Sequence, residues 1–254
     1  MSIAAALGGV GLFSAIASAS TIADVYSGGA GNYNLTGVQV AAILDSYNGK
    51  DTIVLQDSTG SIIDYALPNT VYTPTVGDKF NITATNTPYQ DGAELTGSTT
   101  ALTSLITPGA APTPPVLTIP QLNAATAGSD GLTNFGTPPY AEAIVTLDNV
   151  SFASGTPSPL ANKKTYTIQD SMGNTAVVYT YGTYSNVSAG DAQINSILAA
   201  DGTGQLMDMT GYVDNFYGES EFYPLAAVAV PEPGCIALAA IGGLALVRRR
   251  RRSA

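Results

Sequence analysis

The stretch Leu55-Gln56-Asp57-Ser58-Thr59-Gly60 returns in the second half of the chain as Ile168-Gln169-Asp170-Ser171-Met172-Gly173. In each copy an aspartate can hydrogen-bond forward to the backbone, and the closing glycine accepts a positive φ, so both copies predict a tight turn. Apolar and β-prone residues stand on both sides of each turn. The two copies therefore predict a strand-turn-strand unit that occurs twice in the chain.

Further strands are expected outward from each copy. In the first half we predict strands at residues 38–44, 52–56, 61–66, 79–85 and 93–99, with Asn48-Gly49 supplying the positive φ values of a type I′ hairpin. In the second half we predict strands at 143–152, 166–169, 175–181, 205–213 and 219–228, with an amphipathic helix at 189–200. The interval from Thr83 to Glu94-Leu95 matches the interval from Thr210 to Glu221-Phe222, which supports a duplication.

Five strands with a helix between the third and the fourth follow the order of the OB-fold. Residues 52–60 and 74–83 resemble bacterial extracellular OB-fold domains. We therefore predict an all-β chain of two tandem OB-fold-like five-stranded barrels, at 34–104 and 140–228, with a short apolar helix at each terminus. A β-sandwich is the alternative. Residues 20–34 are expected to form a loose lead-in, and the Pro/Gly-rich residues 105–139 a stiff linker with one helical turn at 121–127.

Residues 1–19 have an apolar body and end in Ala17-Ser18-Ala19. An apolar segment before small residues at positions like Ala17 and Ala19 is typical of a secretory signal peptide with its cleavage site. The segment departs from that pattern because it has no lysine or arginine ahead of the apolar body. A buried N-terminal helix is the alternative.

Residues 230–252 carry Pro231-Glu232-Pro233, then the uncharged residues 235–247, then five arginines: Arg248, Arg249, Arg250, Arg251 and Arg252. The two prolines favour an extended, accessible backbone. The uncharged run is short for a membrane span, but arginines that reach the headgroups would help it and hold its inner end at the cytoplasmic side. A buried core helix with a basic tail is the alternative.

This order of motifs, which covers only residues 230–252, resembles the PEP-CTERM sorting signal of Gram-negative bacteria. The resemblance implies recognition by an exosortase, transient anchoring in the inner membrane, cleavage near Pro231-Glu232-Pro233 and delivery to the cell surface or extracellular matrix. Cys235 is the only cysteine, which excludes an internal disulfide. It is either an apolar residue of the span or a site of lipidation.

Composition excludes several functions. The chain has no histidine, so it has no Ser-His-Asp triad and no imidazole metal ligand. Without the two ends, four lysines stand against eighteen carboxylates. A chain this acidic is not suited to bind a phosphate backbone, and we expect no nucleic-acid partner. We also expect no cofactor.

Two groups of residues are candidates for a site. Tyr166, Tyr179, Tyr181, Phe216 and Tyr217 lie on the second and third strands and the four–five loop of the second unit, which are the ligand-binding surfaces of OB-folds. Such rings would stack on sugars, or else they fill the barrel core. Glu219 and Glu221 share one strand face, with Asp208 and Asp214 nearby, and would suit a calcium site, an acid–base pair or an exposed charged face.

We therefore expect an exported surface or matrix protein with a non-enzymatic structural or interaction role. The first alternative is a module that binds carbohydrate, such as a matrix polysaccharide, or another ligand on the second unit's aromatic face. The second alternative is a metal-dependent hydrolase that works with carboxylates alone.

Overall fold

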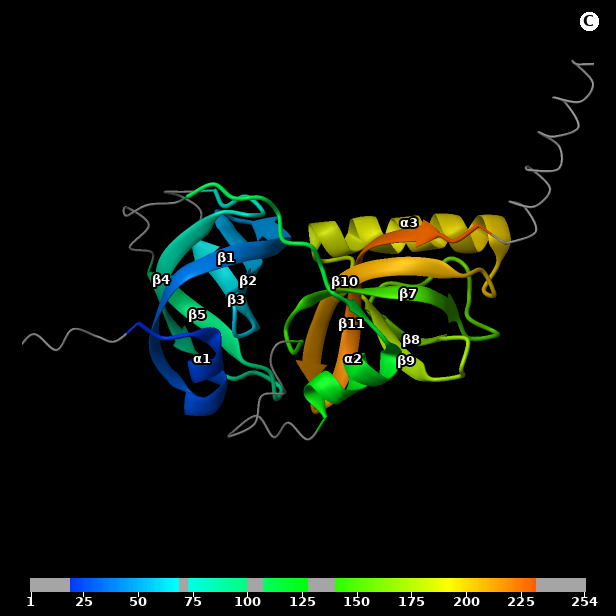
Figure 1. The fold of residues 1–254 in the computed structure, drawn as a ribbon. Coiled ribbons are helices and arrows are strands. Elements are labelled where there is room, and N and C mark those ends of the chain that lie inside the picture. The colour runs from blue at the N-terminus through cyan, green and yellow to red at the C-terminus, as the bar shows by residue number, and fades with distance from the viewer. Residues whose placement is uncertain (1–18, 69–72, 100–106, 128–139, 232–254) are drawn as a thin grey trace, which may run out of the picture.

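The computed structural model describes residues 19–68, 73–99, 107–127 and 140–231, and within them the chain forms two five-stranded barrels that lie side by side (Figure 1). Both predicted terminal helices lie outside the described residues, as do Ala17, Glu232, Pro233 and the five arginines. Ala19 and Pro231 lie at the two ends of the described part, and both are exposed.

The first barrel consists of β1 (Gly31–Tyr47), β2 (Lys50–Gln56), β3 (Ser61–Pro68), β4 (Lys79–Asn86) and β5 (Glu94–Thr99). Its strand order is β1-β2-β3-β5-β4, and β4 closes the barrel on β1. The long β1 pairs with both β2 and β4, and its register with β4 shifts around Gly37, which has φ +68°. A glycine suits this bend because it adopts a positive φ without strain.

The second barrel repeats this order with β7 (Ile144–Phe152), β8 (Lys164–Gln169), β9 (Thr175–Thr180), β11 (Glu219–Ala229) and β10 (Met207–Phe216), and β10 closes on β7. The helix α3 (Ser185–Asp201) lies between β9 and β10 in sequence. The helix packs so closely on β11 that a Cβ added at Gly190 would lie 2.2 Å from the carbonyl oxygen of Pro224.

Closure of both sheets confirms the all-β prediction of two tandem OB-like barrels, and a β-sandwich is excluded for the described residues. In both barrels the third strand pairs in parallel with the fifth, as the OB order requires. The hairpin between β1 and β2 has Asn48 at φ 52° and Gly49 at φ 72°, as its sequence predicts.

One expectation about the connecting segments is wrong, and a second is incomplete. Residues 20–34 are not a loose lead-in: they form α1 (Ile22–Gly28) and the start of β1. Thr21 and Asp24 cap the helix, Ile22 and Val25 are fully buried in the first barrel's core, and Asp57 Oδ2 accepts a 2.8 Å hydrogen bond from the Ile22 amide. The short helix is therefore stabilised by its buried face and by its cap, although the surrounding glycines suggest a loop.

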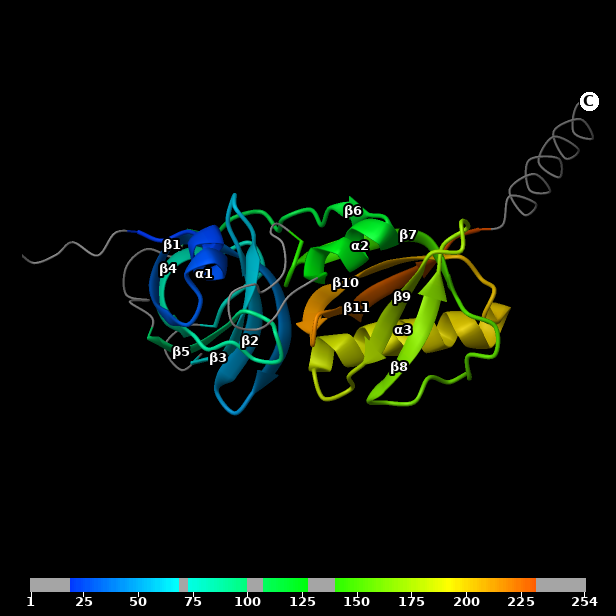
Figure 2. The ribbon, with the colours of Figure 1, turned by 90° about the horizontal axis from the view of Figure 1, so that it is seen from below.

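The described part of the predicted linker, residues 107–127, contains the helix expected near 121–127 and also a strand that joins the second barrel's sheet. The strand is β6 (Val116–Leu117), which pairs with β7, and the helix is α2 (Ile119–Thr126), which contacts β9 and β11. Figure 2 shows α2 and α3 on opposite sides of the second barrel. Leu117, Ile119 and Leu122 belong to that barrel's core. A proline stands at the start of α2, where its missing N–H leaves no helical hydrogen bond unmade.

The two barrels share an apolar cluster. The first barrel contributes Ala41, Ala42, Leu44, Val54 and Ile63, and the second contributes Ile144, Val187, Tyr212 and Tyr223. Hydrogen bonds join the barrels as well: the Tyr217 amide donates to the Gln90 carbonyl at 2.8 Å, and the Ser185 amide to Asp45 Oδ1 at 3.1 Å. This contact fixes the faces that the barrels present to each other.

Candidate functional site

A pocket of about 550 Å³ lies between the barrels. Seven tyrosines and four carboxylates are among the side chains that line it. β3 and the β4–β5 connection supply its wall from the first barrel, and β9, β10 and β11 supply most of its wall from the second. In the first barrel these are the third strand and the four–five connection, and in the second barrel they are the third, fourth and fifth strands. The pocket therefore includes the third strand of each barrel, which belongs to the ligand-binding face of OB-folds.

Equivalent residues of the two barrels face the same pocket. Glu94 pairs with Ile63 in the parallel β3–β5 ladder, and Glu221 pairs with Val177 in the parallel β9–β11 ladder. The same alignment matches Tyr65 with Tyr179 on the third strands, and Tyr89 with Phe216 before the fifth strands. All six residues line the pocket: Tyr65, Tyr89, Glu94, Tyr179, Phe216 and Glu221. The repeated strand order therefore places two similar half-sites in one cavity.

The aromatic wall of the second barrel is a continuous cluster of rings. The ring centroids of Tyr179 and Tyr181 lie 5.8 Å apart at 29°, and those of Tyr181 and Tyr184 lie 4.7 Å apart at 85°. The ring centroid of Tyr223 lies 5.3 Å from that of Tyr179. Stacked and edge-on rings at these distances support one another and hold their faces in place.

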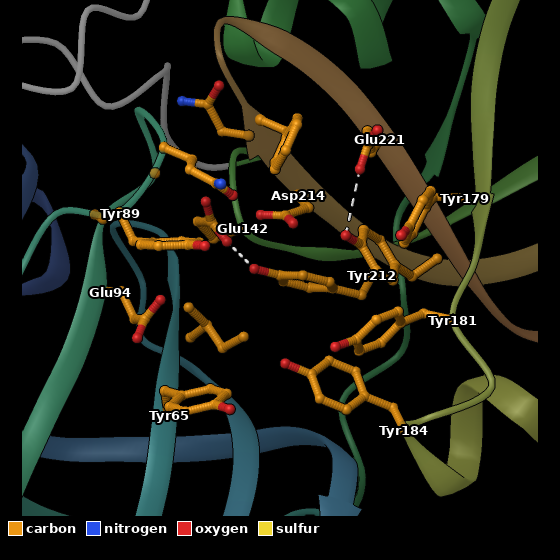
Figure 3. A pocket seen from close by; sticks show the side chains of 17 residues that line it. Tyr65, Tyr89, Glu94, Glu142, Tyr179, Tyr181, Tyr184, Tyr212, Asp214 and Glu221 are labelled. Atoms are coloured by element: carbon orange, nitrogen blue, oxygen red, sulfur yellow. Dashed lines mark hydrogen bonds between the residues drawn. The ribbon is translucent and has the colours of Figure 1, made fainter. Parts of the chain in front are cut away.

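Glu142 lies in the middle of the pocket wall, between the two half-sites (Figure 3). Its side chain is 1% exposed, and its Oε2 accepts a hydrogen bond from the Tyr212 hydroxyl. Its Oε1 has no hydrogen-bond partner among the described residues. The backbone of Glu142 has φ 56°, a conformation that is unfavourable for residues other than glycine. An unpaired buried oxygen on a strained backbone is a feature typical of functional sites.

Burial raises the pKa of all four carboxylates, and the charge of Asp214 adds to the rise in the other three. Burial raises the pKa of Glu94 and of Glu221 to about 7, and the negative charge of Asp214 adds to the shift in both. Burial also raises the pKa of Asp214 to about 6, and it raises the pKa of Glu142 well above its ordinary value, with the charge of Asp214 as the second cause. The pocket therefore favours neutral carboxyl groups over isolated charges.

Tyr223 connects two of these carboxylates. Its single hydroxyl proton is donated to Glu221 Oε2 at 3.3 Å. The same hydroxyl can instead donate to Asp214, and this lowers the pKa of that carboxyl against the effect of burial. Within the described residues, no three carboxylates or other ligating side chains gather closely enough to hold a metal ion.

Three of the five predicted aromatic residues line the pocket: Tyr179, Tyr181 and Phe216. Tyr217 is 65% exposed and packs edge-on against Phe216 outside the lining. Tyr166 packs against the second barrel's core, and its hydroxyl accepts a 2.6 Å hydrogen bond from the Ala161 amide, so it does not join the site.

Among the carboxylates singled out by sequence, the pocket brings together Glu221 and Asp214. Glu219 is exposed, and Asp208 accepts a hydrogen bond from the Asn149 amide elsewhere on the barrel. Sequence reasoning missed the first barrel's contribution, Tyr65, Tyr89 and Glu94, and it missed Glu142, Tyr184, Tyr212 and Tyr223. The match of Glu94 with Glu221 was the available signal, but nothing in it indicated that the barrels face each other.

No protein-family model matches the chain, and no curated protein matches it either. Within the described part of the chain, no helix combines the length and the apolar character that a membrane crossing needs.

Proposed function

We propose that this chain is a non-enzymatic binding protein of the cell surface or extracellular matrix, and that the pocket between its barrels binds a saccharide. The observation that carries the proposal is the pocket itself, in which aromatic rings and carboxylates from equivalent faces of both barrels converge. Its volume of about 550 Å³ lies in the range of small-molecule sites.

The chemistry of the lining suits a sugar. Tyrosine rings offer flat apolar faces for the C–H side of a pyranose, and their hydroxyls hydrogen-bond to its polar edge. Carboxylate oxygens accept hydrogen bonds from sugar hydroxyls. Tyr65 is 46% exposed and Tyr89 is 61% exposed, so the rings of the first barrel remain accessible.

The binding proposal is tested on a glycan array, followed by calorimetry on the saccharides that bind. Replacing Tyr179 and Tyr181 with alanine removes two rings of the pocket wall and should weaken binding at least about tenfold, which corresponds to 1.4 kcal/mol. Tyr47→Ala is the matched control, because Tyr47 is 71% exposed and lies at the end of β1, outside the pocket. Unchanged affinity in the double variant would place binding elsewhere.

The export part of the proposal is supported by the two terminal segments, residues 1–19 and 230–252. We propose that the first directs secretion and that an exosortase processes the second after transient membrane anchoring. Fractionation of a host with and without exosortase tests this: the chain should reach the surface or the medium only with the enzyme. Glu232→Ala should retain it in the membrane. Recovery of the chain from the cytosol with both ends intact would contradict the proposal.

A glycoside hydrolase is the second candidate, because the pocket holds several carboxylates whose pKa values are raised to about 6–7. A protonated glutamate beside an ionised carboxylate is the pair that cleaves glycosidic bonds, the first protonating the leaving oxygen and the second acting as base or nucleophile. Release of reducing ends that disappears in Glu221→Gln would select this candidate. Binding without release would select the binding protein.

A further inference from the structure

We propose that the pocket selects saccharides that carry free amino groups, and that it takes two consecutive amino-sugar residues, one in each half-site. This inference rests on the proposed saccharide-binding function and names the ligand class. It follows from the charge of the lining, from one unpaired oxygen, from the aromatic faces and from the duplication.

Every charged side chain among the described lining residues is acidic: Glu94, Glu142, Asp214 and Glu221. Lys163 places its Nζ 5.5 Å from the centroid of the Tyr181 ring, but it does not belong to the lining. When these carboxyl groups ionise, their charges have one sign and lie between partly apolar walls, so the negative potential is focused in the cavity and favours cations over neutral or anionic ligands.

Glu142 Oε1 provides the specific contact. This oxygen is buried and has no hydrogen-bond partner among the described residues, so a ligand that donates a hydrogen bond to it would remove an energetic cost. An ammonium group has three N–H donors and a positive charge, and it can serve this oxygen and a neighbouring acceptor together. A hydroxyl has a single donor and leaves the charge of the cluster uncompensated.

The aromatic rings favour the same ligand. A cation near the face of a tyrosine is attracted by the ring's negative face, and this attraction is strongest where water is excluded. The wall formed by Tyr179, Tyr181, Tyr184 and Tyr223 therefore suits the ammonium as well as the ring of an amino sugar.

The duplication sets the number of sugar residues. Tyr65 and Glu94 of the first barrel lie across the pocket from Tyr179 and Glu221 of the second, with Glu142 and Asp214 between them (Figure 3). Two similar half-sites suit a ligand with two similar units. A disaccharide of glucosamine has this form, with one ring and one ammonium for each half-site.

The test is calorimetry on the full chain with three probes: the glucosamine disaccharide, the matched N-acetylated disaccharide, and 1,4-diaminobutane. We expect the glucosamine disaccharide to bind at least tenfold more tightly than the acetylated one, and to release protons at pH 6.5 as the carboxyl groups ionise beside it. Glu142→Gln and Glu221→Gln should each abolish this preference, while Glu219→Gln, on the exposed part of the same strand, should keep it.

The outcomes separate the two proposals. If neither disaccharide nor any other saccharide binds, the proposed function fails. If the two disaccharides bind equally, saccharide binding stands and selection for the amine is overturned. If 1,4-diaminobutane binds as tightly as the glucosamine disaccharide, the assignment to an amino sugar is overturned, because the pocket then recognises ammonium groups alone. Should Glu142→Gln not fold, Glu221→Gln still decides the role of the carboxylates.

Discussion

Glu221→Gln should make the protein more stable at pH 8.5 and leave its stability at pH 4.5 almost unchanged. Glu221 is 9% exposed and lies beside Asp214, and burial raises its pKa from 4.5 to about 7. The folded protein therefore keeps this proton up to about pH 7, whereas the unfolded chain releases it near pH 4.5. Because the folded state binds more protons across this window, the free energy of unfolding falls as pH rises from 4.5 through 7 and stays low above it.

The magnitude follows from the pKa change. At 1.36 kcal/mol for each pKa unit, a rise from 4.5 to about 7 corresponds to about 3 kcal/mol. Solvent at the open side of the pocket screens part of this penalty, so we expect a loss of about 1–2 kcal/mol in the wild type. Glutamine cannot ionise, and the variant should therefore escape this loss.

The assay is denaturant unfolding at pH 4.5 and pH 8.5, followed by circular dichroism, for the wild type, Glu221→Gln and the control Glu219→Gln. The difference between wild type and Glu221→Gln should grow by about 1–2 kcal/mol between the two pH values. Glu219→Gln should follow the wild type closely, because Glu219 is exposed, lies outside the pocket and is the smallest of the causes that raise the pKa of Glu221. Parallel pH profiles for the wild type and Glu221→Gln would refute the reasoning about burial.

Two further predictions concern packing and the turn aspartates. Replacing glycine with alanine inside a helix ordinarily stabilises it, but Gly190→Ala should destabilise the fold by about 1–3 kcal/mol. The reason is that the added Cβ would lie 2.2 Å from the carbonyl oxygen of Pro224. A raised melting temperature of this variant would contradict the close packing of α3 on β11. Asp57→Ala should lower the free energy of unfolding by about 1 kcal/mol, which is a larger loss than Asp170→Ala should cause. Both aspartates accept hydrogen bonds within their turns, but only Asp57 also accepts one from the Ile22 amide of α1. Equal losses for the two variants in denaturant unfolding would show that the contact with α1 contributes nothing.

The barrels could be predicted from the sequence because their signals are local. The Asn48-Gly49 hairpin and the turns at Asp57 and Asp170 depend on residues close together in the chain, and alternating apolar residues mark the strands between them. Two matching sets of five strands, with a helix after the third strand in the second set, were enough to give the OB order.

The pocket could be predicted only in part, because it depends on how the barrels face each other. Tyr179, Tyr181 and Phe216 were found because they lie on a known ligand surface of a single barrel. Glu142 stands just before β7 with no motif around it, and it becomes notable only through its burial and its contact with Tyr212. Apolar clusters between domains leave no periodic signal in sequence.

The segments around the barrels show a second limit. Glycines in residues 20–34 suggested a loop, yet α1 is a helix with a capping box and a buried apolar face. The helical turn expected at 121–127 is confirmed as α2, but its packing in the second barrel's core was not predicted from the prolines around it. In both cases a few buried side chains outweigh the local composition.

The most direct test of the account is a crystal structure of the full chain with the glucosamine disaccharide. The account predicts density between the barrels, with one sugar between Tyr65 and Glu94, the other against Tyr179 and Glu221, and an ammonium group beside Glu142 Oε1. Density on another surface, or a pocket that holds only water at saturating disaccharide, would contradict it.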